Sequence, residues 1–240
     1  MTNTLDKYVA AYQGDNIYDF DNEILLTWYP QRVLHHAGAA RSLLELGLGH
    51  GYTTDIFSRR FDRHVVLEGS PAVIDNFRDK HPNCSAEIVE TWFENFTTDE
   101  RFDLIVMGFI LEHVDDPLLI LQRFRNFLVP GGRMFLAVPN AEALNRRLGH
   151  IAGLLDDIEL LSENDDLLGH KRFYTAATLS ADIAKAGCGI VRLEGIYLKP
   201  LTTRQIISLQ LDQNIIDALC RVGIDYPELS CGLLAEVSLR

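Results

Sequence analysis

Short apolar runs alternate with segments of helical periodicity through most of the chain. Runs of this length, bounded by turn residues, are typical of buried strands, and the segments between them suit covering helices. The pattern therefore predicts a parallel sheet with helices on both faces. The expected strands of the first half are 41–46, 64–68, 86–89, 102–108 and 133–138.

The clearest expected helix covers residues 117–128. Asp115 or Asp116 can cap its first turn, and Pro117 suits the first helical position because proline has no amide hydrogen to lose. Apolar residues then recur at helical spacing until the Pro-Gly-Gly run at 130–132. That run is expected to stop the helix before the next strand.

After residue 139 the pattern changes. Residues 140–172 are mostly helical in character and acidic in their second half, so we expect an insertion over the sheet. The alternation resumes with an expected helix at 175–186, a strand at 189–198, a helical stretch at 203–222 and a last strand at 233–239. No linker rich in glycine, proline or serine divides the chain, so residues 1–240 are predicted to form one domain.

Composition narrows the class of partner. Of the 240 residues 47% are apolar, enough for a full core, and 34 acidic against 22 basic residues give a net charge of −12. The electrostatic field of this negative net charge disfavours nucleic acid and anionic membranes as partners and favours a small molecule.

The chain has no apolar run of membrane-spanning length and no leader pattern at its start, so a cytoplasmic protein is expected. A homodimer is left open.

The strongest local signal is a glycine-rich turn after the first strand. Glu45 lies in that strand, and Gly47, Gly49 and Gly51 follow before a helix is expected to begin near residue 52. Glycine tolerates positive φ and lets a ligand approach the backbone at the carboxyl end of a strand. This arrangement indicates a nucleotide-like cofactor.

The type of cofactor follows from the acids around that turn. Glu68 ends the second strand about 20 residues on, where a carboxylate can accept both hydroxyls of a ribose. A dinucleotide site needs G-x-G-x-x-G, whereas these glycines run G-x-G-x-G. Glu45 would also repel a pyrophosphate, but it suits a cofactor with an ammonium group such as S-adenosylmethionine.

Taken together, these motifs resemble the class I S-adenosylmethionine-dependent methyltransferases, in particular the bacterial small-molecule enzymes of the ubiquinone type. The matching segments, in the family's order between about residues 41 and 190, are 45–51, Glu68, 102–117, 129–132 and 170–175. The resemblance implies a Rossmann-like doubly wound sheet with an antiparallel last strand. It also implies methyl transfer to an oxygen or nitrogen of a small-molecule acceptor.

The same resemblance implies a set of cofactor residues. The acid and glycine loop would hold the methionine end, Glu68 the ribose, and the segment after the third strand the adenine, with the choice between Glu90 and Thr91 open. Backbone from 108 to 111 would pass near the sulfonium. The full expected set is Glu45, Gly47, Gly49, Gly51, Glu68, Gly69, Glu90, Thr91, Trp92, Gly108 and Leu111.

On the acceptor side the expected residues lie outside the donor motifs. His113 is a candidate base or a helix-start histidine bonded to backbone, and His170 either faces the acceptor or caps a helix. Tyr12, Tyr18 and Arg172 are candidate acceptor contacts. The cover over the site is expected from the helical segments 1–40 and 140–172 and the variable segment 199–230.

Several alternatives stay open at this point. Glu112 with His113 could contribute to a divalent metal site, but no third ligand stands at a persuasive spacing, so no metal is expected. The four cysteines form no C-x-x-C pair and are expected to be free thiols. The rival functions are a nicotinamide-dependent oxidoreductase and a cofactor-binding protein without catalysis.

Overall fold

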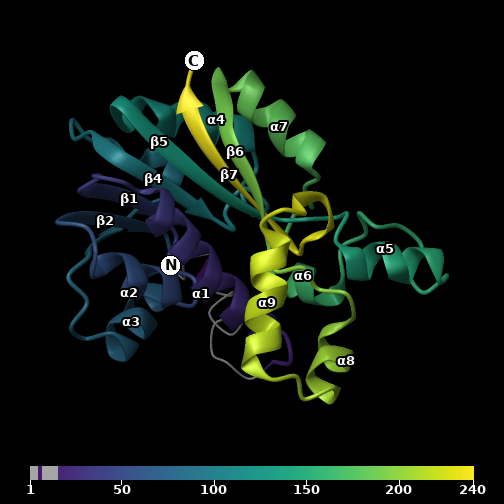
Figure 1. The fold of residues 1–240 in the computed structure, drawn as a ribbon. Coiled ribbons are helices and arrows are strands. Elements are labelled where there is room, and N and C mark those ends of the chain that lie inside the picture. The colour runs from purple at the N-terminus through teal and green to yellow at the C-terminus, as the bar shows by residue number, and fades with distance from the viewer. Residues whose placement is uncertain (1–4, 7–15) are drawn as a thin grey trace.

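The computed structural model describes residues 5–6 and 16–240, which form a seven-stranded sheet with helices on both faces (Figure 1). The strand order is β3-β2-β1-β4-β5-β7-β6. The strands are β1 Ser42–Leu46, β2 Arg63–Glu68, β3 Glu87–Glu90, β4 Phe102–Gly108, β5 Leu128–Pro139, β6 Cys188–Ile196 and β7 Gly232–Leu239.

The direction of the strands confirms the predicted fold. All neighbours among β1 to β5 pair in parallel, while β7 pairs antiparallel with both β5 and β6. The order reverses between β1 and β4, which lie side by side. Ligands of open α/β sheets bind in the crevice at this reversal, beyond the carboxyl ends of the strands.

Helices cover the sheet on both sides. The helices are α1 Asp19–His36, α2 Tyr52–Ser58, α3 Pro71–Lys80, α4 Pro117–Phe124, α5 Leu144–Ile151, α6 Glu163–Leu168, α7 Ala176–Lys185, α8 Thr203–Ser208 and α9 Gln213–Gly223. The α4 and α7 helices pack together on one face, whereas α1 and α2 share the other.

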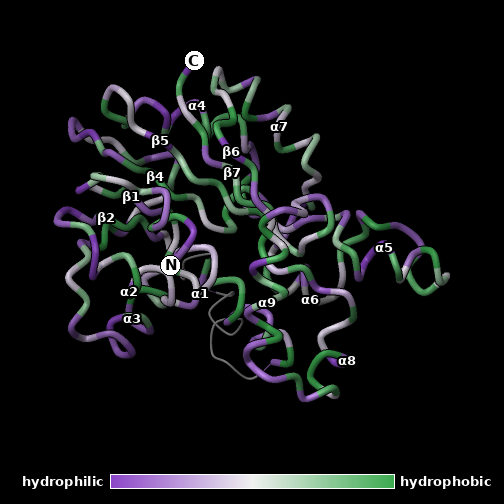
Figure 2. Tube along the Cα trace, viewed as in Figure 1, coloured by the Kyte–Doolittle hydropathy of each residue, from purple (hydrophilic) through white to green (hydrophobic). Residues whose placement is uncertain are grey.

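Alternating side chains of the central strands build the two halves of the core. Leu44 and Ile105 pack with the α4 and α7 side, while their neighbours Leu43 and Leu104 pack with α1 and α2. Hydrophobic residues therefore take consecutive positions within these strands, as at 43–44 and 104–107, and Figure 2 shows stretches of the sheet in green. Continuous apolar runs are expected where a parallel sheet is covered twice.

Two expected boundaries were wrong. The α4 helix ends at Phe124, followed by a 3₁₀ turn at 125–127, and residues 130–132 lie inside β5 as an irregularity in its pairing with β4. The helical stretch at 203–222 is two helices, because Gln210 takes a positive φ of 48° after α8 and α9 begins anew at Gln213, with Asp212 as its N-cap residue.

The expected insertion at 140–172 contains α5 and α6. The α5 helix projects from the body of the molecule, while α6 lies closer to the carboxyl end of the sheet (Figure 1). Within the described ranges, no helix has the length and apolar character required to cross a membrane.

Candidate active site

A cavity of about 350 Å³ opens at the carboxyl ends of β1, β2 and β4. Its volume is within the range of small-ligand pockets. One end is lined by Glu68, Thr91 and Trp92, and the other by Glu112 and His170. The cavity thus joins the expected donor residues to the expected acceptor residues in one continuous space.

The glycine-rich loop forms one wall of this cavity. Gly47 and Gly51 adopt φ values of 79° and 86°, a left-handed conformation that side chains disfavour. A Cβ at Gly47 would lie 2.7 Å from the Ile110 Cδ1, and one at Gly51 would lie 2.7 Å from the Phe77 Cδ2. Both positions therefore need glycine, and Gly49 lines the cavity between them.

Glu68 lies at the end of β2 with its carboxylate in the cavity wall. Its oxygens accept hydrogen bonds from the backbone amides of Leu48, at 3.0 Å, and Ser70, at 2.8 Å. Burial raises the pKa of this carboxyl above its ordinary value, against the opposing effect of those amides. Gly69 lines the cavity next to it.

Glu45 has a different place from the one expected. It is 1% exposed and lies beneath the loop instead of lining the cavity. Its oxygens accept hydrogen bonds from Thr53 at 2.6 Å and Thr54 at 2.9 Å, and one oxygen lies 2.9 Å from the His64 Nε2. These contacts fix the first turn of α2 against β1, so Glu45 holds the loop in place.

The segment after β3 supplies the far end of the cavity. Thr91 and Trp92 line it, and the Thr91 amide donates to the Glu68 carbonyl at 2.9 Å. Glu90 is exposed and is absent from the lining. Of the two alternatives left open by the sequence, the structure brings Thr91 to the cavity.

Where β4 ends, the backbone lies against a tyrosine from α1. A Cβ at Gly108 would lie 1.9 Å from the Tyr29 hydroxyl oxygen, so only glycine fits there. Tyr29 lines the cavity although it is 1% exposed. Leu111 is fully buried and does not line the cavity, so its side chain belongs to the core.

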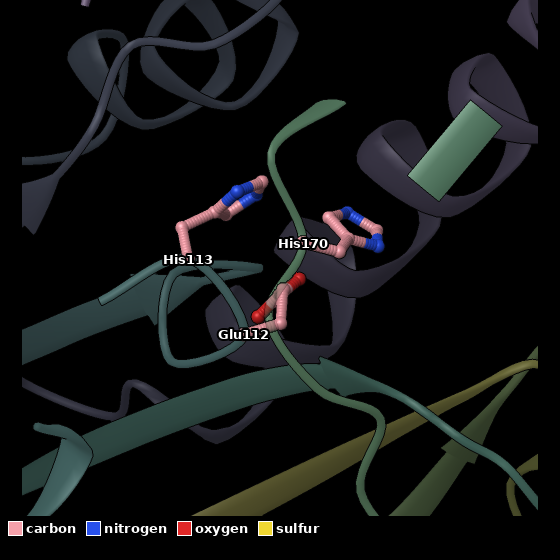
Figure 3. A group of neighbouring side chains, drawn as sticks. All are labelled: Glu112, His113 and His170. Atoms are coloured by element: carbon pink, nitrogen blue, oxygen red, sulfur yellow. The ribbon is translucent and has the colours of Figure 1, made fainter. Parts of the chain in front are cut away.

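Glu112, His113 and His170 gather at the other end of the cavity. The first two follow β4, the third follows α6, and the three side chains converge on one space (Figure 3). One side-chain nitrogen or oxygen from each of the three lies within 4.8 Å of those of the other two. Local sequence spacing does not indicate that His170 lies beside His113, because the two stand 57 positions apart and no spacing rule connects them.

The three side chains of this cluster differ in the direction of their pKa shifts. Burial raises the pKa of the Glu112 carboxyl to about 7, and both of its oxygens lack a hydrogen-bond partner among the described residues. Burial and the neighbouring His170 lower the pKa of His113 to about 3. Burial also acts to lower the pKa of His170, but the hydrogen bond to Asp165 and the charge of Glu112 outweigh it and leave that pKa raised.

Arg172 does not reach the cavity. Its guanidinium donates to the carbonyl oxygens of Leu111 at 2.8 Å, Val114 at 2.6 Å and Asp115 at 3.2 Å. These bonds tie the segment after α6 to the loop after β4. Arg172 therefore supports the cluster instead of lining the acceptor space.

The tyrosines expected over the site are only partly described. Tyr12 lies outside the described residues, and Tyr18 precedes α1 with 39% exposure and does not line the cavity. The α1 helix nevertheless contributes to the lining, and so do other residues that sequence reasoning missed. Among them are Asn22, Leu25, Leu26, Tyr29, Phe93, Pro139, Leu168 and Lys171.

Known proteins resemble this chain in both sequence and fold. A model of the methyltransferase domain family matches residues 23–193. A ubiquinone biosynthesis O-methyltransferase of Acinetobacter baumannii strain ACICU is 22% identical over 208 residues, covering 85% of this chain and 86% of that protein. One from Nitrobacter winogradskyi is 26% identical over 189 residues, covering 77% and 70%.

Solved structures show the same architecture. The N-methyltransferase NodS of Bradyrhizobium japonicum, in complex with S-adenosyl-L-homocysteine, aligns with a TM-score of 0.63 at 16% identity, covering 98% of this chain and 97% of NodS. An S-adenosylmethionine-dependent methyltransferase from Thermotoga maritima aligns with a TM-score of 0.66 at 16% identity, covering 98% of both chains.

The family match covers more than half of the chain and spans the glycine loop, Glu68 and the Glu112–His113 pair. This finding rejects the alternative of a nicotinamide-dependent oxidoreductase. The chain belongs to the methyltransferase domain family and is a class I S-adenosylmethionine-dependent methyltransferase.

Proposed function

We propose that this methyltransferase methylates an oxygen or a nitrogen of a small-molecule acceptor that binds beside Glu112, His113 and His170. The observation that carries the proposal is the single cavity that joins the Glu68 end to this cluster. Methyl transfer requires donor and acceptor to be held in line at close range, which one continuous pocket allows.

The donor would occupy the end lined by the glycine loop. Glu68 would accept the ribose hydroxyls, with Thr91 and Trp92 beside the adenine and Gly108 near the sulfonium. Glu45 would act through the loop and α2, since Thr53, Thr54 and His64 already occupy its oxygens. In this placement Glu68 contacts the cofactor directly, whereas Glu45 keeps the glycine loop in the shape that binds it.

The acceptor would occupy the end lined by α1 and by residues 168–171. Leu25, Leu26 and Phe109 give this end apolar walls, while Glu112 and the two histidines provide its polar groups. An imidazole with a pKa near 3 is a weak base, so we assign His113 to contact with the acceptor. Few catalytic groups are needed, because the sulfonium is already activated.

The similar proteins are consistent with either oxygen or nitrogen as the methylated atom of the acceptor. The curated relatives that we name methylate oxygen, whereas NodS is an N-methyltransferase. A small cavity with mixed walls suits a phenol or alcohol as well as an amine. Oxygen is the first choice, because these sequence relatives are 22% and 26% identical to this chain, against 16% for NodS.

A screen for acceptor-dependent turnover tests this function. The purified protein is mixed with S-adenosylmethionine and separate panels of phenols, alcohols and amines, and S-adenosylhomocysteine release is measured by mass spectrometry. We expect release only with the accepted class. His113→Ala should lower turnover by about 10²-fold, the scale for a misplaced acceptor, while S-adenosylhomocysteine affinity is unchanged.

The matched control for this experiment is His150→Ala. His150 is exposed on α5, and its imidazole hydrogen-bonds to the Leu155 carbonyl, away from the residues that line the cavity, so turnover should be preserved. If no panel releases S-adenosylhomocysteine above background, the acceptor is not one of the phenols, alcohols or amines tested, and the proposal is rejected. If His113→Ala turns over as fast as the wild type, the acceptor binds elsewhere.

A further inference from the structure

Tyr29 is a buried tyrosine of α1 that lies against the end of β4. It is 1% exposed, yet it lines the cavity. Its hydroxyl oxygen occupies the space that a Cβ at Gly108 would need, 1.9 Å from that position. The proposed function places the sulfonium near Gly108, so this hydroxyl lies where the donor end of the cavity meets the acceptor end.

The α1 helix is fixed to the sheet close to Tyr29. Arg32, three residues further along the helix, donates two hydrogen bonds to the Glu194 carboxylate on β6, at 2.8 Å and 2.9 Å. Glu194 is 5% exposed, so water competes little for this pair. A guanidinium that binds both carboxylate oxygens fixes orientation as well as position. The phenol ring is therefore held at the end of β4.

The residue after Gly108 has a strained backbone and packs against the same phenol. Phe109 has a φ of 57°, which is uncommon for a bulky side chain, and its amide donates to the Ala137 carbonyl at 2.8 Å. Its ring meets the Tyr29 ring edge to face, with the ring centroids 5.8 Å apart. Strain that the surrounding structure maintains is concentrated at ligand sites. The end of β4 is thus shaped around Tyr29.

The state of the phenol limits its chemistry. Burial first, and then the negative charges of Glu45 and Glu112, raise the pKa of Tyr29 well above the ordinary 10.0. The hydroxyl therefore stays neutral. A neutral phenol is a weak base and a poor nucleophile, but its oxygen still accepts hydrogen bonds. Methyl C–H groups on a positively charged sulfur are polarised and can donate weak hydrogen bonds of this kind.

We propose that the Tyr29 hydroxyl oxygen accepts a C–H···O contact from the methyl group of S-adenosylmethionine and holds that group toward the acceptor end. The inference rests on the proposed function, because it needs the sulfonium beside Gly108. Tyr29 forms and breaks no covalent bond. Its contribution is alignment, which methyl transfer needs because the carbon must face the acceptor atom in line with the bond that breaks.

Calorimetry with two ligands tests this contact without any turnover. S-adenosylmethionine and S-adenosylhomocysteine differ only in the methyl group and the charge on sulfur. The full wild-type chain and Tyr29→Phe, which removes one hydroxyl, are titrated with each ligand in the absence of an acceptor. Tyr29→Phe should weaken S-adenosylmethionine by about 5–30-fold, the scale of a charge-assisted C–H···O contact, and leave S-adenosylhomocysteine within about twofold.

The matched control is Tyr197→Phe. Tyr197 is 0% exposed, packs in the same half of the core as Tyr29 and does not line the cavity. Removal of its hydroxyl should leave the affinity for both ligands unchanged. Thermal unfolding checks that each variant is folded.

Proton resonance of the bound donor gives a second measurement that needs no variant. The ligand is S-adenosylmethionine isotopically labelled at its methyl carbon. Its methyl protons should resonate downfield of their position in the free ligand, because a C–H···O contact deshields them. In Tyr29→Phe the downfield shift should be smaller.

Two calorimetric results would overturn the inference and leave the proposed function standing. Equal losses of affinity for both ligands would make Tyr29 a packing residue of the cavity wall. Unchanged affinities in Tyr29→Phe would show that the hydroxyl does not touch the methyl group. If the wild-type chain binds neither ligand, the proposed function fails and the inference fails with it. If Tyr29→Phe does not fold, the wild-type methyl resonance decides, and the absence of a downfield shift rejects the contact.

Discussion

Glu45 and Glu68 both occupy parallel strands that end at the same edge of the sheet, yet only Glu68 reaches the cavity. Glu45 lies one residue before the end of β1, and the hydroxyls of Thr53 and Thr54 meet it from α2. Glu68 is the last residue of β2 and turns toward the loop, where two backbone amides hold it. Glu45 therefore stabilises the glycine loop, whereas Glu68 is placed to bind the proposed cofactor.

At the residue scale, the pH dependence of donor binding tests Glu68. Burial raises its pKa above the ordinary 4.5, and only the ionised form can accept both ribose hydroxyls. The affinity for S-adenosylhomocysteine should therefore be full above that raised pKa and should fall as the pH decreases through it. Calorimetry over a pH series, with circular dichroism to check folding, measures this effect.

The control for this prediction is Glu68→Gln, which keeps the shape and removes the titrating group. It should bind S-adenosylhomocysteine about 1–3 kcal/mol more weakly at neutral pH and should show no further loss in the same acid range. Equal affinities of wild type and variant at neutral pH would mean that another group holds the ribose.

Some site residues could be predicted from the sequence and others could not, for a physical reason. Glu68 and the glycine loop stand in a local strand-turn-helix pattern that has its own spacing. His170 lies beside Glu112 only because the chain returns over the sheet 58 positions later. Tyr29 reaches Gly108 from a helix whose apolar spacing is the same as that of a core helix, so no local signal marks it.

At the element scale, α1 is fastened to the segment before α8 by a buried ion pair. The Lys199 Nζ lies 2.6 Å from the Asp21 Oδ2, and Thr203 donates to the same oxygen at 2.5 Å. The side chains of Lys199 and Asp21 are 8% and 11% exposed. None of residues 199–230 lines the cavity, so this segment acts on the site through α1, which does.

Removing the lysine tests this connection. Lys199→Met would leave the Asp21 carboxylate buried without its cation, and breaking such a pair costs about 3–5 kcal/mol. Urea unfolding should show that loss in the free energy of unfolding. Lys185→Met, at an exposed pair with Asp182, is the matched control and should cost at most about 1 kcal/mol. Similar values for both variants would show that the pair does not fasten α1.

The sequence predicted the presence and order of the helices and strands more accurately than their first and last residues. Four of the five strands of the first half match the expected runs to within one residue, whereas β5 begins at Leu128, five residues before its expected start. Residues 130–132 misled the prediction, since Pro130 and two glycines read as a stop, whereas the start of β5 accommodates them as a pairing irregularity. Pairing with β4 is a tertiary interaction that local turn signals do not contain.

At the scale of the whole molecule, the cavity is built by segments from several parts of the chain. The sheet supplies the donor end, and α1 together with residues 168–171 supplies the acceptor end. The α5 helix, in the expected cover segment 140–172, projects from the body of the molecule (Figure 1), and none of its residues lines the cavity. The glycine loop and Glu68 are local sequence motifs, and they form the donor end of the cavity. The acceptor end forms only when residues 168–171, which come later in the chain, fold back beside the sheet.

A crystal structure of the chain with S-adenosylhomocysteine tests the central claim most directly. We expect the ribose hydroxyls within hydrogen-bond distance of Glu68, the adenine beside Thr91 and Trp92, and the sulfur directed toward Glu112 and His113. In that orientation the sulfur, which carries the methyl group in the donor, faces the proposed acceptor end of the cavity. A ligand bound outside this cavity, or one whose sulfur points away from the cluster, would contradict the account.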